Sequence, residues 1–410
     1  MGLLLSEPLK APGIGLQMGV PLVDRFLDEI DPDETVQILR SLVKLDTVNP
    51  PGNELRAASY IAGLLRRAGI PVELMEVEPG RPNLYAILGG PGTPKLTFEG
   101  HMDVVPVGSE ERWSVDPFSA EVVDGRVYGR GSADAKGSLA AMVETLLALK
   151  RAGFNPSEPL ALLAVMGEET GNLGIRHALK EGFRSSMAVV GEPTGLEVKT
   201  AHKGVLGVEV TARGRTAHAA MPWAGVNAIV GMAKLVLKLE EFDRAVLKTR
   251  QSRLVGSPSL AVTTIGGGVK RNVVPDRCSI TIDRRLIPGE TPQTALSEIQ
   301  DIVDKLLSEE PQLKADIGLL YADPPSEVSE NEEVVQFARK AVKIVRGRDP
   351  GVSGFEAHCD MGALVNAGIP TVILGPGDLS LAHRADENLS VEELVEAAKV
   401  YTALAVLTCG

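Results

Sequence analysis

The sequence is poor in cysteine and in aromatic residues, and it has no surplus of positive charge. Its 410 residues include only three cysteines, Cys278, Cys359 and Cys409, and they form no Cys-x-x-Cys pair. A small and odd number of cysteines argues against a disulfide framework and suggests a reducing, cytoplasmic environment. The formal net charge of −12 argues against binding to nucleic acid or to an anionic membrane, since both interactions need a basic surface.

Several motifs are also missing. The chain contains no Gly-x-Ser-x-Gly segment, which argues against a serine hydrolase, and no phosphate-binding Gly-x4-Gly-Lys-Ser/Thr loop. No window approaches the roughly 20 apolar residues that a membrane-spanning helix needs. The leucines at positions 3–5 have no cationic segment before them and no long apolar run after them, so we expect no signal peptide.

The chain is rich in aliphatic residues that follow the periods of strands and helices. Apolar residues make up 44% of it and aromatic residues 4%, so we expect aliphatic cores, and the length predicts two domains. After an irregular lead-in over residues 1–32, periodicity predicts helices at 33–45, 54–68, 137–151, 170–181 and 332–345, and strands at 72–77, 83–88, 95–100, 160–166, 187–190 and 371–374. This alternation predicts an α/β fold, a mostly parallel sheet flanked by helices.

The pattern changes near residue 204. Strands are expected at 205–211, 259–266, 277–284 and 313–319, with helices at 228–240 and 291–307. The order β-α-β-β-α-β is typical of a ferredoxin-like α+β unit. We therefore predict a discontinuous larger domain, residues 1–203 and 320–410, interrupted by a smaller inserted domain, residues 204–319.

Two apolar segments end in charged groups. One runs into His101 and Asp103, and the other into Glu168 and Glu169. Imidazole and carboxylate groups are seldom buried unless they are paired or bound to metal, so these strand ends indicate a metal site. A strand places His101 and Asp103 on the same side, where one can bind metal while the other orients the imidazole. The structural alternatives are a buried His–Asp pair and two solvated glutamates at a helix start.

Three further residues complete the set. Asp134 precedes the predicted helix 137–151 and could instead be its N-cap; Glu192 closes an apolar strand, and His383 follows a glycine turn. With one bridging carboxylate, five ligands would give each of two metals three protein ligands and an open position for water, as in catalytic zinc sites: His101, Asp134, Glu169, Glu192 and His383. Three carboxylates and one hydroxide would balance the charge of two divalent ions, so the cluster could be buried at tolerable cost.

These residues, in this order, resemble the motifs of the M20 metallopeptidase family over residues 40–405. The most specific segments are His101-Met102-Asp103-Val104-Val105-Pro106, Gly129-Arg130-Gly131-x-x-Asp134-x-Lys136-Gly137 and Glu168-Glu169. The resemblance implies a metal-binding catalytic domain interrupted by a lid, which often forms the contact of a homodimer.

The resemblance also implies roles for individual residues. His101, Asp134 and Glu192 would bind one metal, and Asp134, Glu169 and His383 the other. Asp134 would bridge the two ions and be followed by a cis peptide bond to Ala135. Glu168 would be the general base and acid, and Asp103 would orient His101. Zinc is the expected metal, although cobalt or manganese could fit the same nitrogen and oxygen ligands.

By the same resemblance, the smaller domain contacts the substrate. His218 would stabilise the oxyanion, often from the partner subunit, and Asn272 would touch the substrate. Arg285 would bind the substrate carboxylate, although Arg284 could take that role. The structural alternatives are a histidine at a helix start for His218 and a solvated charge on an edge strand for Arg285.

The activity implied is metal-assisted removal of the acyl group from an N-acyl amino acid, as in acetylornithine deacetylases and succinyl-diaminopimelate desuccinylases. A dipeptidase or carboxypeptidase would use the same residues. A non-catalytic ligand-binding protein is the alternative from another class, but neither Glu168 nor a ligand is lost. A succinyl group would need another cationic contact, for which Lys270 and Arg271 are available.

One segment departs from the family pattern. Many members have a Gly-Thr-Asp-Ala type segment where this chain has Ala357-His358-Cys359-Asp360. Asp360 takes the matching place. His358 and Cys359 have no evident set of partners, so we interpret them as structural, together with His177 and His202.

Overall fold

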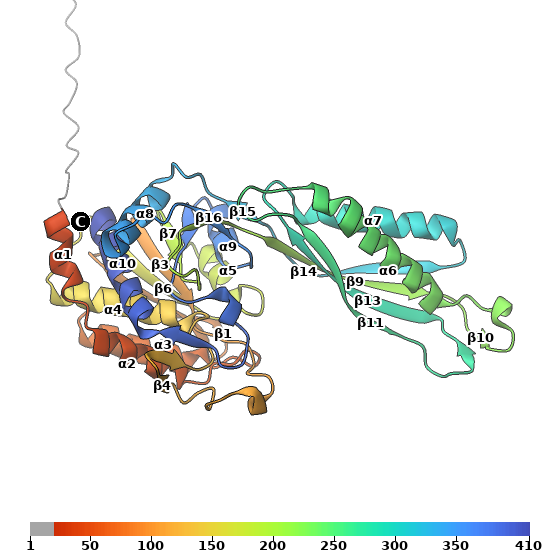
Figure 1. The fold of residues 1–410 in the computed structure, drawn as a ribbon, viewed down its shortest axis with the longest axis horizontal. Helices are drawn as coiled ribbons and strands as arrows, with labels where there is room; N and C mark the ends of the chain where they lie inside the picture. Colours follow the sequence, from red (N-terminus) through yellow and green to blue (C-terminus); the bar gives the residue numbers. More distant parts are fainter. Residues whose placement is uncertain (1–19) are drawn as a thin grey trace, which may run out of the picture.

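The computed structural model describes residues 20–410, which form a larger and a smaller lobe (Figure 1). Residues 1–19, which include the leucines near the N-terminus and most of the predicted irregular lead-in, lie outside the described part. For residues 20–27 that prediction was wrong, because they form the helix α1 (Val20–Leu27). Val23 and Phe26 of this helix are buried, and the Phe26 ring meets Phe154 edge to face at a centroid distance of 5.2 Å.

The larger lobe contains a mixed sheet whose central strands are parallel. Its strand order is β1-β2-β6-β3-β7-β17-β8-β15, and β16 also pairs with β8. The strands β6, β3, β7 and β17 run parallel, which confirms the expected parallel arrangement at the centre, whereas β1, β2 and β15 pair antiparallel at the flanks. The bounds are β1 Val72–Glu78, β2 Arg81–Leu88, β3 Leu96–His101, β6 Leu160–Val165, β7 Ala188–Val190, β8 Lys199–His202, β15 Ser326–Glu327, β16 Ser353–Phe355 and β17 Thr371–Ile373.

Helices cover both faces of this sheet. The central strands are buried along their whole length, as parallel strands covered on both faces should be. α4 and α10 pack against β3, and α5 and α9 lie on the other side (Figure 1). The bounds are α2 Pro32–Val43, α3 Glu54–Arg67, α4 Lys136–Arg151, α5 Leu173–Lys180, α8 Glu333–Arg346, α9 Met361–Asn366 and α10 Val391–Cys409, with the 3-10 turns η1 Glu110–Arg112 and η4 Leu379–Leu381.

Helices α5 and α10 differ from the sequence prediction. α5 begins at Leu173, later than expected, because Asn172 before it takes a left-handed conformation with φ 58°. α10 was not predicted. It is buried on nearly all sides, so its sequence lacks the polar face that reveals an amphipathic helix.

A small sheet with strand order β18-β5-β4 lies beside the main sheet. It consists of β4 Val122–Val123, β5 Arg126–Tyr128 and β18 Asn388–Ser390. β18 immediately precedes α10, and β5 immediately precedes the glycine-rich turn that leads to α4. The pairing of β18 with β5 therefore brings the 383–388 region next to the turn that carries Asp134.

The smaller lobe has the expected β-α-β-β-α-β order. Its sheet is fully antiparallel with strand order β11-β13-β9-β14, and α6 and α7 cover one face. A short two-stranded sheet, β10 with β12, extends from its far end (Figure 1). The bounds are β9 Gly204–Arg213, β10 Ala217–His218, η2 Pro222–Ala224, α6 Ala228–Ala245, η3 Leu247–Thr249, β11 Ser259–Gly267, β12 Val273–Val274, β13 Arg277–Leu286, α7 Pro292–Glu309 and β14 Lys314–Asp323.

Each lobe has its own hydrophobic core. One core draws its buried residues from positions 23–198 and 328–409, and the other from positions 206–313. These cores support our proposal that residues 204–319 form an inserted domain, although β14 continues to Asp323. Over residues 20–410, no helix combines the length and apolarity that crossing a membrane requires.

Candidate metal and catalytic site

The carboxyl ends of the parallel strands meet at one edge of the main sheet. His101 is the last residue of β3, and Glu168 and Glu169 follow the end of β6. Glu192 follows β7, and the segment after β17 leads to His383. Because parallel strands present their carboxyl ends at the same edge, tertiary structure gathers groups that are far apart in the sequence.

Asp134 lies between two imidazoles. Its Oδ1 is 3.1 Å from His101 Nε2, and its Oδ2 is 3.3 Å from His383 Nε2. Glu192 Oε1 lies 3.9 Å from His101 Nε2, and Glu169 Oε1 lies 3.2 Å from His383 Nε2. The structure therefore brings all five predicted ligands together, with one acid beside each histidine and Asp134 shared by both.

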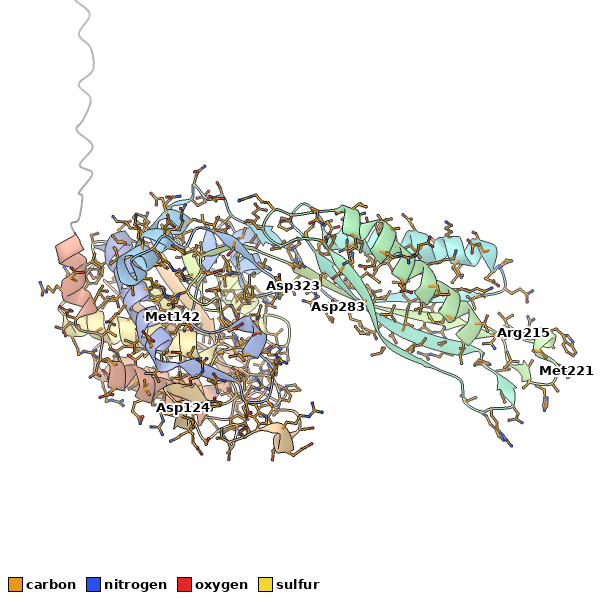
Figure 2. The ribbon with its side chains drawn as sticks, viewed as in Figure 1. Asp124, Met142, Arg215, Met221, Asp283 and Asp323 are labelled. Atoms are coloured by element: carbon orange, nitrogen blue, oxygen red, sulfur yellow. The ribbon has the colours of Figure 1, made fainter. Side chains whose placement is uncertain are left out.

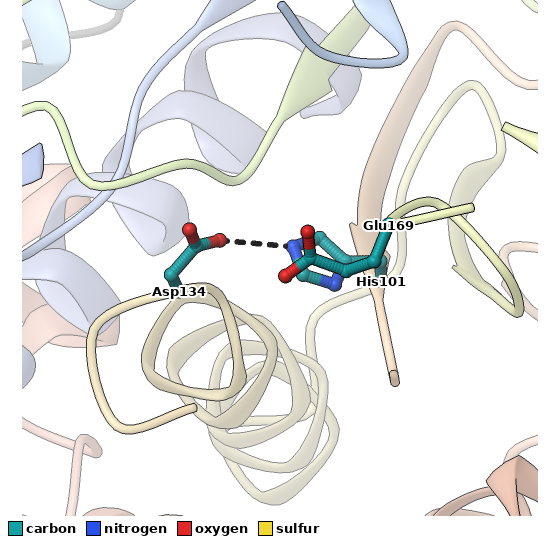
Figure 3. Close-up of side chains that lie close together, drawn as sticks. All are labelled: His101, Asp134 and Glu169. Carbon is teal, nitrogen blue, oxygen red and sulfur yellow. Dashed lines mark hydrogen bonds and ion pairs between the residues drawn. The ribbon is translucent and has the colours of Figure 1, made fainter. Parts of the chain in front are cut away.

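Figure 3 shows the central part of this cluster, with the carboxylates of Asp134 and Glu169 directed toward the His101 ring. One ligand-type atom from each of these three residues lies within 4.8 Å of the others. His101 Nδ1 is 2.9 Å from the main-chain carbonyl oxygen of Asp103. That carbonyl can only accept, so Nδ1 carries a proton, and Nε2 is the ring nitrogen that faces the site.

Asp134 does not act as a helix cap. The N-cap of α4 is Ala135, which makes no side-chain capping bond, and the peptide bond between Asp134 and Ala135 is cis, as the resemblance implies. The turn is held instead by Glu387, whose Oε1 accepts the main-chain N–H groups of Ala133 and Asp134 at 3.0 Å. Glu387 Oε2 pairs with buried Arg130 at 2.5 Å. This support leaves the Asp134 carboxylate free to face the imidazoles.

The Asp103 carboxylate holds the turn that carries the two glutamates. Asp103 Oδ1 accepts the N–H of Glu168 at 3.1 Å, and Oδ2 accepts the N–H of Glu169 at 3.2 Å. Its Oδ1 lies 3.7 Å from His101 Nδ1, beyond hydrogen-bonding distance. In this structure the main chain of Asp103, rather than its carboxylate, orients His101.

The electrostatics of the cluster favour a bound cation. Burial raises the pKa of Glu168 and of Glu192 well above the ordinary value, and neighbouring acids add to both shifts. Burial lowers the pKa of His101, but the hydrogen bond with Asp134 and nearby glutamates raise it well above its usual range. Hydrogen bonds with Asp134 and Glu169 raise the pKa of His383 to about 10. Protons are thus retained unless a cation replaces them, and the nitrogen and oxygen donors fit a divalent metal of the zinc type.

A cavity of about 610 Å³ opens onto this cluster. The larger lobe contributes Glu168, Glu169 and Thr170 to its lining, and the smaller lobe contributes Arg285 and Tyr321. The cavity thus combines acids, a cation and an aromatic ring from both lobes.

The structure separates the two candidate arginines. Arg284 is fully buried and pairs with Glu290 at 2.7 Å, whereas Arg285 lines the cavity and pairs with Asp283 at 2.8 Å. The buried alternation along β13 was a usable signal for this difference, since Ile280, Ile282 and Leu286 share the inward face with Arg284.

The other predicted substrate contacts lie elsewhere in the same chain. His218 lies in β10 and Asn272 immediately precedes β12, and the N–H of Ala219 donates to the Asn272 carbonyl at 3.0 Å. Figure 2 labels Arg215 and Met221, which flank His218 in the sequence, at the far end of the smaller lobe, while Asp323 lies where the lobes meet. The exposed residues Lys270 and Arg271 lie in the loop between β11 and β12. Within one chain, these side chains do not line the cavity.

Sequence reasoning assigned no role to two residues that the structure places at the site. Glu387 supports the Asp134 turn, and its position after His383 was the available signal. His358 was interpreted as structural, but it lines the cavity, with Nε2 3.8 Å from Asp323 Oδ2. Burial lowers the pKa of His358 to about 3, so its ring is neutral. Cys359 and His202 are fully buried, in agreement with their structural interpretation.

Comparison with known proteins gives matches along most of the chain. A sequence profile described as Peptidase family M20/M25/M40 matches residues 97–406. An acetylornithine deacetylase from Myxococcus xanthus is 30% identical over 381 residues, covering 91% of this chain and 97% of the relative. An N-formyl-4-amino-5-aminomethyl-2-methylpyrimidine deformylase from Bacillus subtilis is 28% identical over 407 residues, covering 92% of this chain and 95% of the relative.

The fold also matches solved structures. A tripeptidase from Staphylococcus aureus superposes with a TM-score of 0.77 at 22% identity, covering 93% of this chain and 99% of the other. At this identity the likeness concerns the fold alone, and it includes both lobes.

Proposed function

The chain belongs to peptidase family M20/M25/M40, hydrolases that act on amide or peptide bonds, and from this premise we propose that it removes the acyl group from an N-acyl amino acid. The observation that carries the proposal is the position of Asp134, whose two oxygens face two different imidazoles. A carboxylate in that position suits a bridge between two metal ions. The similarity to a deacetylase and to a deformylase favours deacylation over peptide cleavage.

We propose that His101, Asp134 and Glu192 hold one divalent ion and that Asp134, Glu169 and His383 hold the other. Zinc is the expected metal, with cobalt or manganese as alternatives. When bound, such a pair lowers the pKa of a water molecule and polarises a carbonyl group.

The side chains of the cavity would then perform the proton transfers. Glu168 lies beside the ligand Glu169 but has no assigned ligand role, so it is the candidate general base. It takes a proton from the attacking water and returns it to the leaving amine. Arg285, which lines the cavity, would hold the substrate carboxylate and so orient the amide toward Glu168.

We propose that the active form is a homodimer built through the smaller lobe. His218 and Asn272 do not line the cavity of their own chain. In a dimer, they could serve the cavity of the other subunit. The smaller lobe exposes large apolar side chains, including Trp223 at 78%, Val269 at 86% and Ile265 at 61%. Exposed apolar groups of this kind are typical of a surface that another protein covers.

A substrate panel tests the proposal. The zinc- or cobalt-loaded protein is assayed with N-acetylornithine, N-succinyl-diaminopimelate, an N-formyl amino acid and simple dipeptides. Faster hydrolysis of an N-acyl amino acid than of any dipeptide is expected. Preference for a dipeptide would assign the chain to the peptidases of the family, and binding without any turnover would favour a non-catalytic role.

A further inference from the structure

A turn that is distant in sequence lies directly against the site. The segment Asn49-Pro50-Pro51-Gly52-Asn53 connects α2 with α3. Just before it, the main chain runs beside the residues that follow β3. The N–H of Asn49 donates to the Val104 carbonyl at 2.9 Å, and the N–H of Val104 donates to the Thr47 carbonyl at 3.1 Å. Asn49 is only 3% exposed, so its side chain has a fixed environment.

The Asn49 amide makes two hydrogen bonds. Its Nδ2 lies 2.8 Å from Asp103 Oδ2 and 2.8 Å from Thr170 Oγ1. An amide nitrogen carries two protons, so both are used. The Asp103 carboxylate already accepts the N–H groups of Glu168 and Glu169, and it can only accept. The amide must therefore present its nitrogen, and not its oxygen, to this carboxylate.

The second bond determines the direction of the Thr170 hydroxyl. Because Thr170 Oγ1 accepts a proton from Asn49, its own O–H points away from the amide. Thr170 is exposed and lines the cavity, beside Glu168 and Glu169. Its hydroxyl proton is thus available as a donor to a molecule bound in the cavity.

We propose that Asn49 is a positioning residue for the reaction, an inference that rests on the proposed amide hydrolysis. Its amide holds the Asp103 carboxylate against the turn that carries Glu168, and it sets the Thr170 hydroxyl as a hydrogen-bond donor to the substrate. Asparagine suits this place because it is neutral and has two donors on one nitrogen. Aspartate would set an acceptor against Asp103, and alanine would remove the hydrogen bond that each partner receives from this position.

Kinetics of four variants of the full-length, metal-loaded protein test this role, with N-acetylornithine or the best substrate of the panel. Asn49→Ala and Thr170→Val should each lower kcat about 10- to 100-fold while metal content is unchanged. Thr170→Ser keeps the hydroxyl and should restore most of kcat. Thr47→Val is the matched control, because Thr47 Oγ1 is buried two residues before Asn49 but bonds the Met102 carbonyl at 2.7 Å instead of Asp103. It should lower the melting temperature and leave kcat unchanged.

The combination of variants adds a second test. Asn49 and Thr170 act through one bond, so Asn49→Ala with Thr170→Val should lower kcat by less than the product of the single effects. Fully multiplicative effects, or wild-type kcat in Thr170→Val, would overturn the assignment of Thr170. Because Thr170 is exposed, these variants should fold even if Asn49→Ala does not.

Hydrogen exchange provides a readout that needs no turnover. The amide protons of Glu168 and Glu169 donate to Asp103, so Asn49→Ala should accelerate their exchange at least about tenfold, whereas Thr47→Val should not. Unchanged exchange would overturn the positioning role of Asn49. If the wild-type protein cleaves no member of the panel, the proposed function fails, and the exchange comparison still decides whether Asn49 holds the turn.

Discussion

Replacing Glu387 by glutamine should destabilise the folded chain by about 3–5 kcal/mol, the usual cost of breaking a buried ion pair from one side. Glu387 is fully buried and Arg130 is 1% exposed, with 2.5 Å between Glu387 Oε2 and Arg130 Nη1. Glutamine keeps the size of the side chain and one oxygen that can accept the N–H groups of Ala133 and Asp134. Its amide nitrogen would face the guanidinium, donor against donor, and leave a buried positive charge without a counter-charge.

A surface pair of similar geometry is the matched control. Arg339 and Asp349 approach to 2.7 Å, but their side chains are 27% and 45% exposed. Asp349→Asn should therefore cost much less than Glu387→Gln, because water and salt screen an exposed pair. The difference between the two variants isolates the contribution of burial.

Denaturant unfolding of the chelator-treated proteins measures both losses without interference from bound metal. A metal titration of the folded proteins provides the link to the site. Because Glu387 supports the main chain at Asp134, Glu387→Gln should also weaken metal binding by about 10- to 100-fold. A loss of stability no greater than that of Asp349→Asn would refute the burial argument. Normal metal affinity in a destabilised variant would refute the supporting role.

Four further outcomes follow from the structure. Glu168→Gln should lower kcat about 10²–10⁴-fold while two metal ions still bind, and near-normal turnover with full metal content would contradict its role as general base. Arg285→Met should raise the KM for an N-acyl amino acid about tenfold or more with a smaller change in kcat, and an unchanged KM would mean that the substrate carboxylate binds elsewhere. Glu168→Ala and His218→Ala chains, each inactive alone, should recover up to about a quarter of wild-type activity after subunit exchange, whereas no recovery would speak against shared sites. Burial lowers the pKa of His202 from 6.5 to about 4. As the pH falls, the His202 imidazole therefore binds a proton in the unfolded chain before it does so in the folded chain. The free energy of unfolding should decrease by about 3 kcal/mol as the pH drops from 6.5 to about 4. In unfolding titrations across that pH range, the free energy of unfolding of His202→Gln should depend less on pH than that of the wild-type protein. An identical slope in the two proteins would exclude His202 as the cause.

Local sequence patterns contained much of the fold. The helix 137–151 and the strand 160–166 were predicted nearly as observed because apolar runs and helical spacing are properties of neighbouring residues. The β-α-β-β-α-β order of the smaller lobe could be read for the same reason. α10 was not predicted, because a helix buried on nearly all sides has no polar face in its sequence. The antiparallel strands at the flanks of the main sheet were also not predicted, because strand order and direction depend on contacts between distant segments.

The sequence by itself determined which chemistry is available: two imidazoles and three acids at the ends of apolar segments, with Glu168 next to a ligand candidate. Only the tertiary structure decided how these groups face one another. It placed Asp134 between His101 and His383, turned the Asp103 carboxylate toward the glutamate turn, and left His218 outside the cavity lining of its own chain. The physical reason is range: the strand period and the apolar character of a segment depend on adjacent residues, whereas a buried polar network forms between segments that meet only when the sheet assembles.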